Sequence, residues 1–178
     1  LRESVMTQGI PEFSVTAYFQ IPTRAMAEPG KFFTELSKTA HVKTPLIFLV
    51  VSSLFLAFAA HLVYQFPNPL VMMSILFTNA LGMTIISAGL GYALVVLITG
   101  RRLSFVQVLS VYAYAAGTVF LAAWIPMALW LTELWKWWLI GAGLSRTCGL
   151  SSRQAWSVVA LSIGLMVLVF WAMLPVIT

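Results

Sequence analysis

From residue 46 onward the chain alternates between long apolar runs and short polar breaks. The runs cover residues 46–64, 70–99, 105–125, 127–144 and 155–176. Most of them are close to the roughly 20 apolar residues that cross the hydrocarbon core of a bilayer as a helix. The pattern therefore predicts an all-α fold, a polytopic membrane helical bundle of five transmembrane helices.

Three of these runs have boundaries that need further argument. The second is longer than the hydrocarbon requires, so we expect its helix to tilt, to kink at Gly82, Gly89 or Gly91, or to extend past the membrane. The third and fourth runs are separated only weakly, at Pro126. Without a break there, one helix would run for about 40 residues, which is longer than a bilayer accommodates.

Residues 1–45 form a polar arm that precedes the predicted transmembrane domain at 46–178. Its four prolines, Pro11, Pro22, Pro29 and Pro45, are expected to divide it into short pieces. The piece from Glu28 to Lys38 predicts a short amphipathic helix, with Phe32, Phe33 and Leu36 on one side and Lys31, Glu35 and Lys38 on the other. This helix is expected to lie in the membrane interface or to pack on the cytoplasmic face of the bundle, and the two are compatible.

The distribution of lysine and arginine predicts the orientation. If the N-terminus is cytoplasmic, the segments 1–45, 100–104 and 145–153 are inside and carry nine of the ten basic residues. This asymmetry is the positive-inside rule. It predicts a multi-pass protein of a prokaryotic inner membrane with its C-terminus outside. Tryptophans favour the headgroup level, and five crowd the predicted outer turn: Trp124, Trp130, Trp135, Trp137 and Trp138.

The composition supports a membrane protein and argues against several other classes. Only 8% of the residues are charged and 61% are hydrophobic. The net charge of +5 does not indicate nucleic-acid binding, because the basic residues are spread singly between apolar runs. Membrane lipids are the expected partners, together with a protein partner or a second copy of the chain.

Four polar residues inside the apolar runs are candidate site residues. Glu133 and Lys136 are three apart and so share one helix face, where they are expected to pair. They fit either an intramembrane functional site or an ion pair in the outer interface with Lys136 extended outward. Asn79 fits a polar cavity or a hydrogen bond between helices. Tyr112 and Tyr114 diverge by about 200° on a helix, so we expect one of them to point into the bundle with its hydroxyl bonded.

Arg101, Arg102, Arg146 and Arg153 form a predicted cytoplasmic basic face. Their default role is to set orientation, and the alternative is recognition of anionic lipid or of a partner. Small residues four apart predict close helix contacts, within or between chains. The pairs are Ser87 with Gly91, Ala113 with Gly117, and Ala160 with Gly164.

No cofactor, metal site or side-chain active site is expected. His41 and His61 stand at opposite ends of one predicted span, about 30 Å apart, so they cannot share a haem. Cys148 is the only cysteine, and the chain has no aspartate. The nucleophile, zinc and phosphate-loop motifs of enzymes are missing.

Several short motifs resemble the Yip family (Ypt/Rab-interacting proteins), in its prokaryotic form. They run from an aromatic helix to the start of the last predicted span, at residues 28–36, 99–105, 111–115, 134–144 and 148–155. The most specific is Cys148-Gly-Leu-Ser-Ser-Arg-Gln-Ala155. The chain departs from the family in its short stretch between spans three and four and in the charge at Lys136.

The resemblance implies a five-span bundle with a cytoplasmic N-terminus. Eukaryotic relatives are associated with prenylated GTPases and vesicle traffic, but no residue here matches a transferable GTPase-binding motif. The resulting hypothesis is a non-enzymatic membrane scaffold, organiser or accessory subunit.

The alternative hypothesis is a small transporter or channel component with a polar path near Asn79, Tyr112 and Glu133/Lys136. A third is a membrane anchor for an electron-transfer complex. Convergence of the polar residues on one cavity would favour transport, and a dry, close-packed bundle would favour a scaffold.

Overall fold

A computed structural model describes residues 15–36 and 42–177. The described chain is all-helical, in agreement with the predicted fold class. Two short helices, α1 (Val15–Ala27) and α2 (Pro29–Leu36), precede five longer ones. These are α3 (Lys43–Tyr64), α4 (Pro69–Thr99), α5 (Phe105–Phe120), α6 (Leu129–Thr147) and α7 (Ser152–Ile177).

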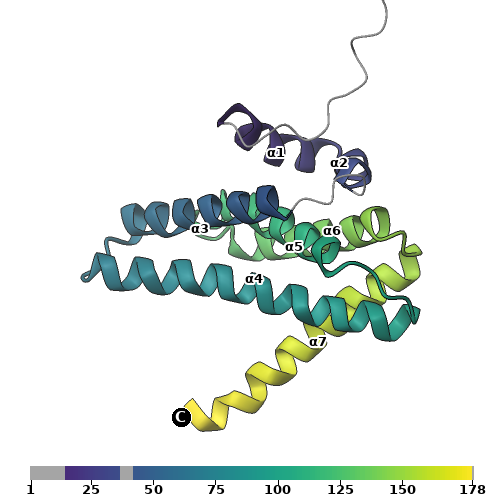
Figure 1. The fold of residues 1–178 in the computed structure, drawn as a ribbon. Coiled ribbons are helices and arrows are strands. Elements are labelled where there is room, and N and C mark those ends of the chain that lie inside the picture. The colour runs from purple at the N-terminus through teal and green to yellow at the C-terminus, as the bar shows by residue number, and fades with distance from the viewer. Residues whose placement is uncertain (1–14, 37–41, 178) are drawn as a thin grey trace, which may run out of the picture.

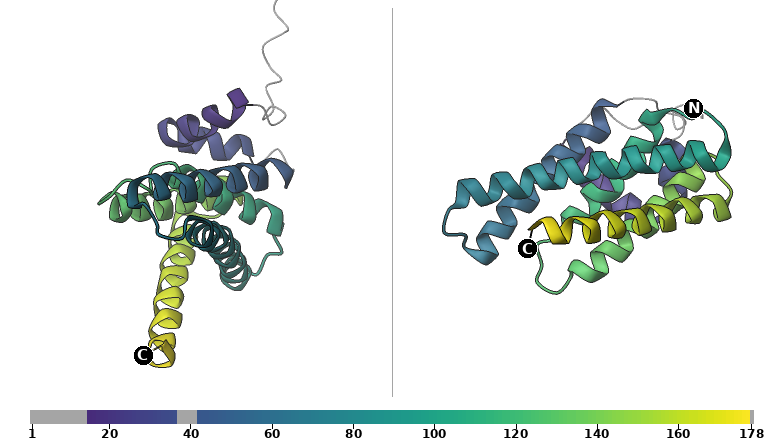
Figure 2. Two further views of the ribbon diagram at one scale, coloured as in Figure 1. Left: turned by 90° about the vertical axis from the view of Figure 1, so that its left-hand side faces the viewer. Right: turned by 90° about the horizontal axis from the view of Figure 1, so that it is seen from below.

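Helix α5 is the centre of the bundle. It packs against α3, α4 and α6, and α1 covers part of its remaining surface. Figures 1 and 2 show α3 to α6 running alongside one another, while α7 leaves the bundle towards its C-terminal end. Every residue from Val108 to Val119 is buried. The apolar side chains of this part of α5 therefore pack against other helices and do not form a lipid-facing surface.

Three of the described helices are long and apolar enough to cross a membrane. They are α3, α4 and the first 18 residues of α7. Helix α5 is apolar but has only 16 residues, which span about 24 Å. The prediction of five spans thus rests on the sequence pattern for α5 and α6. The chain is nevertheless an integral, multi-pass membrane protein.

The long second span is one continuous helix. Helix α4 has 31 residues, a length of about 46 Å, and it passes unbroken through Gly82, Gly89 and Gly91. It ends at Gly100, whose φ of +64° lies in the left-handed region. Glycine adopts that conformation without the clash of a side chain, and it commonly terminates helices for this reason.

The predicted end of the third span at residue 125 is wrong. Helix α5 stops at Phe120, and residues 121–127 form consecutive turns before α6 begins at Leu129 rather than at residue 127. Pro126 lacks an N–H and its ring would clash with the carbonyl of Ala122 in a helix. The Trp124 indole donates a hydrogen bond of 2.8 Å to the Leu121 carbonyl, which provides a partner for the helix end.

The prolines of the arm do not all break helices as predicted. Pro22 lies inside α1 and is buried there, so α1 is an element that the sequence reading missed. The amphipathic helix was predicted correctly as α2, although Lys38 lies outside the described residues. Its apolar side chains Phe32, Phe33 and Leu36 are buried.

Helices α1 and α2 are held on one side of the bundle by specific contacts. The Tyr18 and Ser52 hydroxyls are 3.0 Å apart and share a hydrogen bond between α1 and α3. The Thr147 hydroxyl donates to the Phe33 carbonyl at 2.9 Å and joins α6 to α2. An ion pair of Arg24 with Glu35 connects the two short helices. The packed alternative for α2 is therefore confirmed.

Two of the three small-residue pairs make the close contacts predicted for them, and both are within the chain. A Cβ added at Gly117 would lie 2.6 Å from Phe48 Cε1, so α3 and α5 approach closely there. Gly91 similarly receives the Tyr112 ring. Gly164 has no atom within 4 Å of its would-be Cβ, so the third pair makes no such contact with the described residues.

Candidate intramembrane cavity

A cavity of about 340 Å³ lies between α4 and α6. Its volume falls in the range of about 300–1,000 Å³ that is usual for small-molecule sites. Each flanking helix contributes a stripe of residues three or four positions apart, which is the spacing of one helix face. The lining comprises Leu56 of α3; Leu76, Asn79, Ala80, Met83, Thr84 and Ser87 of α4; Tyr112, Ala116 and Phe120 of α5; Glu133, Lys136, Trp137 and Ile140 of α6; and Met166 of α7.

The four polar candidates chosen from the sequence all line this one cavity. Asn79 comes from α4, Tyr112 from α5, and Glu133 and Lys136 from α6. The residues that sequence reasoning missed are mostly apolar, such as Met83, Ala116 and Met166. The periodic stripes on α4 and α6 are present in the sequence, but only the packing shows that these two stripes face each other.

Glu133 and Lys136 form the predicted ion pair at one end of α6. The Lys136 ammonium donates a hydrogen bond of 2.7 Å to Glu133 Oε1. The Lys136 side chain is 19% exposed and that of Glu133 is 45% exposed, so the lysine lies deeper. The ammonium also lies 5.4 Å from the centre of the Trp137 ring, a distance at which a cation is attracted to an aromatic face.

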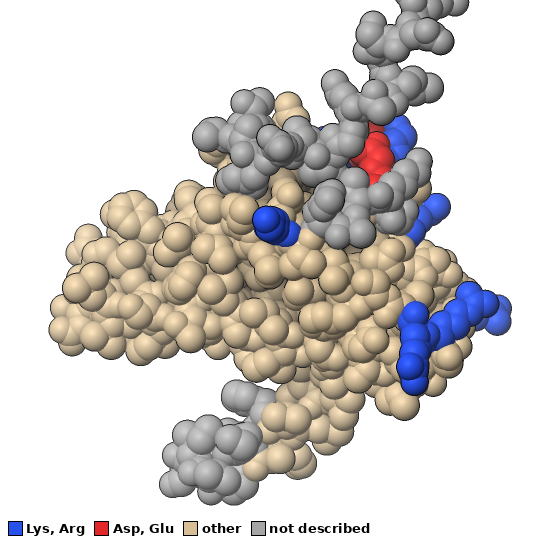
Figure 3. Space-filling model, viewed as in Figure 1, with Lys and Arg blue, Asp and Glu red and all other residues tan. Residues whose placement is uncertain are grey.

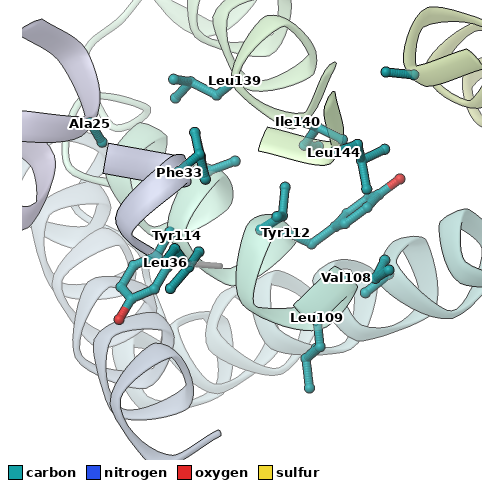
Figure 4. Close-up of a cluster of buried hydrophobic side chains, with 14 of the residues drawn as sticks. Ala25, Phe33, Leu36, Val108, Leu109, Tyr112, Tyr114, Leu139, Ile140 and Leu144 are labelled. Carbon is teal, nitrogen blue, oxygen red and sulfur yellow. The ribbon is translucent and has the colours of Figure 1, made fainter. Parts of the chain in front are cut away.

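Tyr112 and Tyr114 leave α5 in opposite directions (Figure 4), as their spacing requires. Both side chains are buried, and neither hydroxyl has a hydrogen-bond partner among the described residues. The prediction of one inward tyrosine with a bonded hydroxyl is therefore wrong. Its physical reason is the central place of α5: each of its faces meets another helix, so both rings are buried and neither hydroxyl reaches a partner.

The Tyr112 ring closes the floor of the cavity against α4. Its hydroxyl approaches Gly91, where there is no room for a Cβ. Ser162 of α7 lies beside this hydroxyl, yet the two oxygens do not meet hydrogen-bond geometry and both remain unpartnered. In contrast, the Thr84 and Ser87 hydroxyls donate to the carbonyls of Ala80 and Met83 at 2.7 and 2.6 Å. They present little free polarity to the cavity.

Helix α7 covers only part of the cavity. Helices α4 and α6 each pack on α5 and on α7, but they scarcely touch one another. The view from below in Figure 2 shows α7 lying along the gap between them, and Figure 1 shows it turning away from α4. Met166 is its lining residue, and beyond it Val167, Leu168 and Val169 are exposed. Helix α7 therefore contributes to the lining at Met166 and contributes no residue beyond it.

The four arginines of the predicted basic face lie apart from this cavity. Arg101 and Arg102 follow α4, Arg146 is in the last turn of α6, and Arg153 is in the first turn of α7. All four are exposed and make no ion pair with any residue that the structure describes. Figure 3 shows basic side chains gathered at the end of the bundle where these helices meet.

The remaining candidate residues do not form a second site in the part of the chain that the structure describes. No group of three metal-ligating side chains occurs in residues 15–36 and 42–177. His61 stacks on Phe66 with ring centres 5.9 Å apart, and His41 lies outside the described residues. Cys148 follows α6, and burial raises the pKa of its thiol to about 11.

Comparison with models of protein families identifies the family of the chain. The family model described as the Yip1 domain matches residues 23–174, which is most of the chain. Searches of the curated proteins and of the solved structures gave no significant match.

Proposed function

The chain belongs to the family defined by the Yip1 domain and is an integral membrane protein, and we propose that it binds a small molecule inside the bilayer as a small transporter. The observation that carries this proposal is the convergence of Asn79, Tyr112, Glu133 and Lys136 on one cavity. Glu133 and Lys136 add one negative and one positive group to this lining, with which the charged groups of a ligand can pair.

The shape of the cavity favours a carrier over an open channel. The lining ends at Tyr112 and Ser87 and includes none of the arginines at the far end of the bundle. The Tyr112 ring lies against Gly91 at this end of the lining and leaves no room there for a Cβ. A molecule in this site reaches one side of the membrane at a time, which is the arrangement that alternating access uses.

The proposal also covers the orientation of the chain in the membrane and the chemistry of the cavity. The cytoplasmic side would be the end that carries Arg101, Arg102, Arg146 and Arg153, in a prokaryotic inner membrane. The C-terminus would then lie outside. No covalent chemistry is assigned to the cavity, because its polar groups are an ion pair, an amide and a phenol.

The proposal is tested by filling the cavity. Ala80→Phe and Met83→Trp place bulk in its wall, and Ile86→Trp adds bulk to α4 at an exposed position outside the lining. Native mass spectrometry after gentle extraction should find one non-protein ligand per chain in the wild type and in Ile86→Trp. The ligand should be lost from both cavity variants. A wild type without bound ligand, or equal retention in all four proteins, would contradict the proposal.

A scaffold, membrane organiser or accessory subunit is the second candidate function. The observation that favours it is the exposed group of four arginines at one end of the bundle. A stoichiometric protein partner that survives gentle extraction, and is lost when Arg101 and Arg102 are replaced by glutamine, would support it. The same change should leave the cavity ligand in place.

A further inference from the structure

We infer that the ligand of the cavity is a phospholipid whose head group carries a phosphate and a primary ammonium. This inference rests on the proposed function and names its substrate class. The observations behind it are the order of the two charges along α6, the place of the cavity between two helices that scarcely touch, and the apolar side chains that form much of the remaining wall.

Along α6, the negative charge comes before the positive charge, and this order matches that of the ammonium and the phosphate in such a head group. Glu133 is nearer the start of the helix, and Lys136 is about 4.5 Å further along the axis. Lys136 is also the less exposed of the two. In a zwitterionic phospholipid the phosphate is attached to the glycerol and lies deeper than the ammonium. The phosphate would therefore meet Lys136 and the ammonium would meet Glu133.

The tryptophans place this pair at head-group depth. Trp130 and Trp138 are exposed on α6 next to the pair, and indole rings favour the level of the lipid head groups. The nearest membrane surface is the one at the N-terminal end of α6. In the predicted orientation this is the outer leaflet.

A lipid would approach the cavity between α4 and α6, on the side where α7 diverges. These three helices carry exposed apolar side chains, among them Met83, Leu134 and Leu165. A water-soluble solute would have to leave water for hydrocarbon in order to enter by this route, which is strongly unfavourable for a charged group. A lipid already in the leaflet enters sideways, with its head group kept at the interface.

The wall beyond the ion pair suits an acyl chain. It is formed by Leu76, Met83, Ala116, Ile140 and Met166. The hydroxyls of Thr84 and Ser87 in the same wall are bonded to their own helix. An acyl chain offers no hydrogen bonds and suits this apolar part of the wall, whereas Asn79 and the unpartnered Tyr112 hydroxyl of the same lining remain for polar groups of the ligand.

The test is a binding titration on delipidated protein in detergent, followed by native mass spectrometry. The probes are phosphatidylethanolamine, phosphatidylcholine and phosphatidylglycerol with the same acyl chains. Phosphatidylcholine keeps the phosphate but has no N–H to donate to Glu133, and phosphatidylglycerol lacks the positive charge. The wild type should bind phosphatidylethanolamine about tenfold or more tightly than either, because a hydrogen bond to a charged group contributes about that factor.

Variants of Glu133 and Lys136 test which charge of the head group each residue contacts. Lys136→Gln should weaken phosphatidylethanolamine binding about tenfold or more, and Glu133→Gln should make phosphatidylethanolamine and phosphatidylcholine bind equally. Lys43→Gln, at an exposed lysine far from the cavity in sequence, should change neither. The double variant Glu133→Lys with Lys136→Glu keeps the ion pair and the net charge. It should fold and yet lose the preference, which covers the case in which a single variant fails to fold.

The outcomes separate this inference from the proposed function. A bound molecule that is not a lipid, lost in the cavity-filling variants, would overturn the lipid assignment and leave the transporter proposal standing. Lipid binding that is equal for the three head groups, or unchanged in every variant, would show association with the helix surface alone and would overturn the inference. A cavity that holds nothing would contradict both.

Discussion

The Tyr112 ring of α5 lies on the backbone of α4 at Gly91, in the space that a Cβ would occupy. An added Cβ there would be 2.7 Å from Tyr112 Cζ. The two residues therefore depend on each other: the phenol closes the floor of the cavity only because position 91 has no side chain. This relationship sets the separation of two helices that line the proposed site.

Gly91→Ala should destabilise the bundle by about 1–3 kcal/mol, since an extra carbon in a packed contact forces neighbours to shift. Gly89→Ala is the matched control, because nothing lies within 4 Å of its would-be Cβ. That variant should be neutral or slightly stabilising, as alanine is the better helix former. Thermal unfolding in detergent measures both. Equal melting temperatures for the two variants would contradict the contact.

Removing the hydroxyl group should have opposite effects on stability at two buried tyrosines. Tyr114→Phe deletes an unpartnered buried hydroxyl and should leave stability unchanged or raise it. Tyr18→Phe deletes the hydrogen bond to Ser52 and should lower the free energy of unfolding by about 0.5–1.5 kcal/mol. Chemical denaturation of both variants beside the wild type checks the difference. A loss of stability in Tyr114→Phe would mean that its hydroxyl has a partner.

The sequence predicts the ends of four of the five long helices closely. Helices α3, α4, α6 and α7 begin and end within three residues of the predicted limits, because long apolar runs determine them. Helix α5 ends five residues early at Phe120, since Pro126 is a poor residue for a helix interior and residues 121–127 form turns. Pro22 is included in α1, where tertiary packing outweighs the tendency of proline to break a helix.

The sequence predicts the polar residues of the candidate site but not the shape of the cavity. Asn79, Glu133 and Lys136 stand out because each is costly in an apolar run. The apolar wall does not stand out, since Met83 or Ile140 resembles any other membrane residue. Which helix faces meet is decided by close contacts such as that of Tyr112 with Gly91, and these depend on the whole packing.

Cys148 should react slowly with maleimides at neutral pH. Only the thiolate reacts, and burial raises the pKa of this thiol from 9.0 to about 11. A raised pKa lowers the thiolate fraction at any pH below it, here about a hundredfold relative to the ordinary value. The rate in detergent should rise about tenfold per pH unit up to about pH 11. A plateau below pH 9 would contradict the burial.

The orientation is tested by single cysteines placed in a Cys148→Ser background. Asn68, Ser104 and Ser151 are all exposed, so each position is open to a reagent. An impermeant maleimide added to intact cells should label Asn68→Cys, whereas Ser104→Cys and Ser151→Cys should require permeabilised cells. The expectation follows from the concentration of basic residues in the loops of the last two. The reverse pattern would invert the orientation.

The docking of α2 on the bundle is tested at Phe33. Its side chain is fully buried and lies against the α6 backbone at Gly143, where an added Cβ would be 3.0 Å from Phe33 Cε1. Phe33→Ala should lower stability by about 3–5 kcal/mol if the space does not collapse. It should also make α2 more sensitive to protease, because only the Thr147 hydrogen bond and the smaller contacts then hold it. Lys31→Ala, on the exposed side of the same helix, should have little effect. If both variants melt with the wild type, α2 is bound to the membrane surface rather than to the bundle.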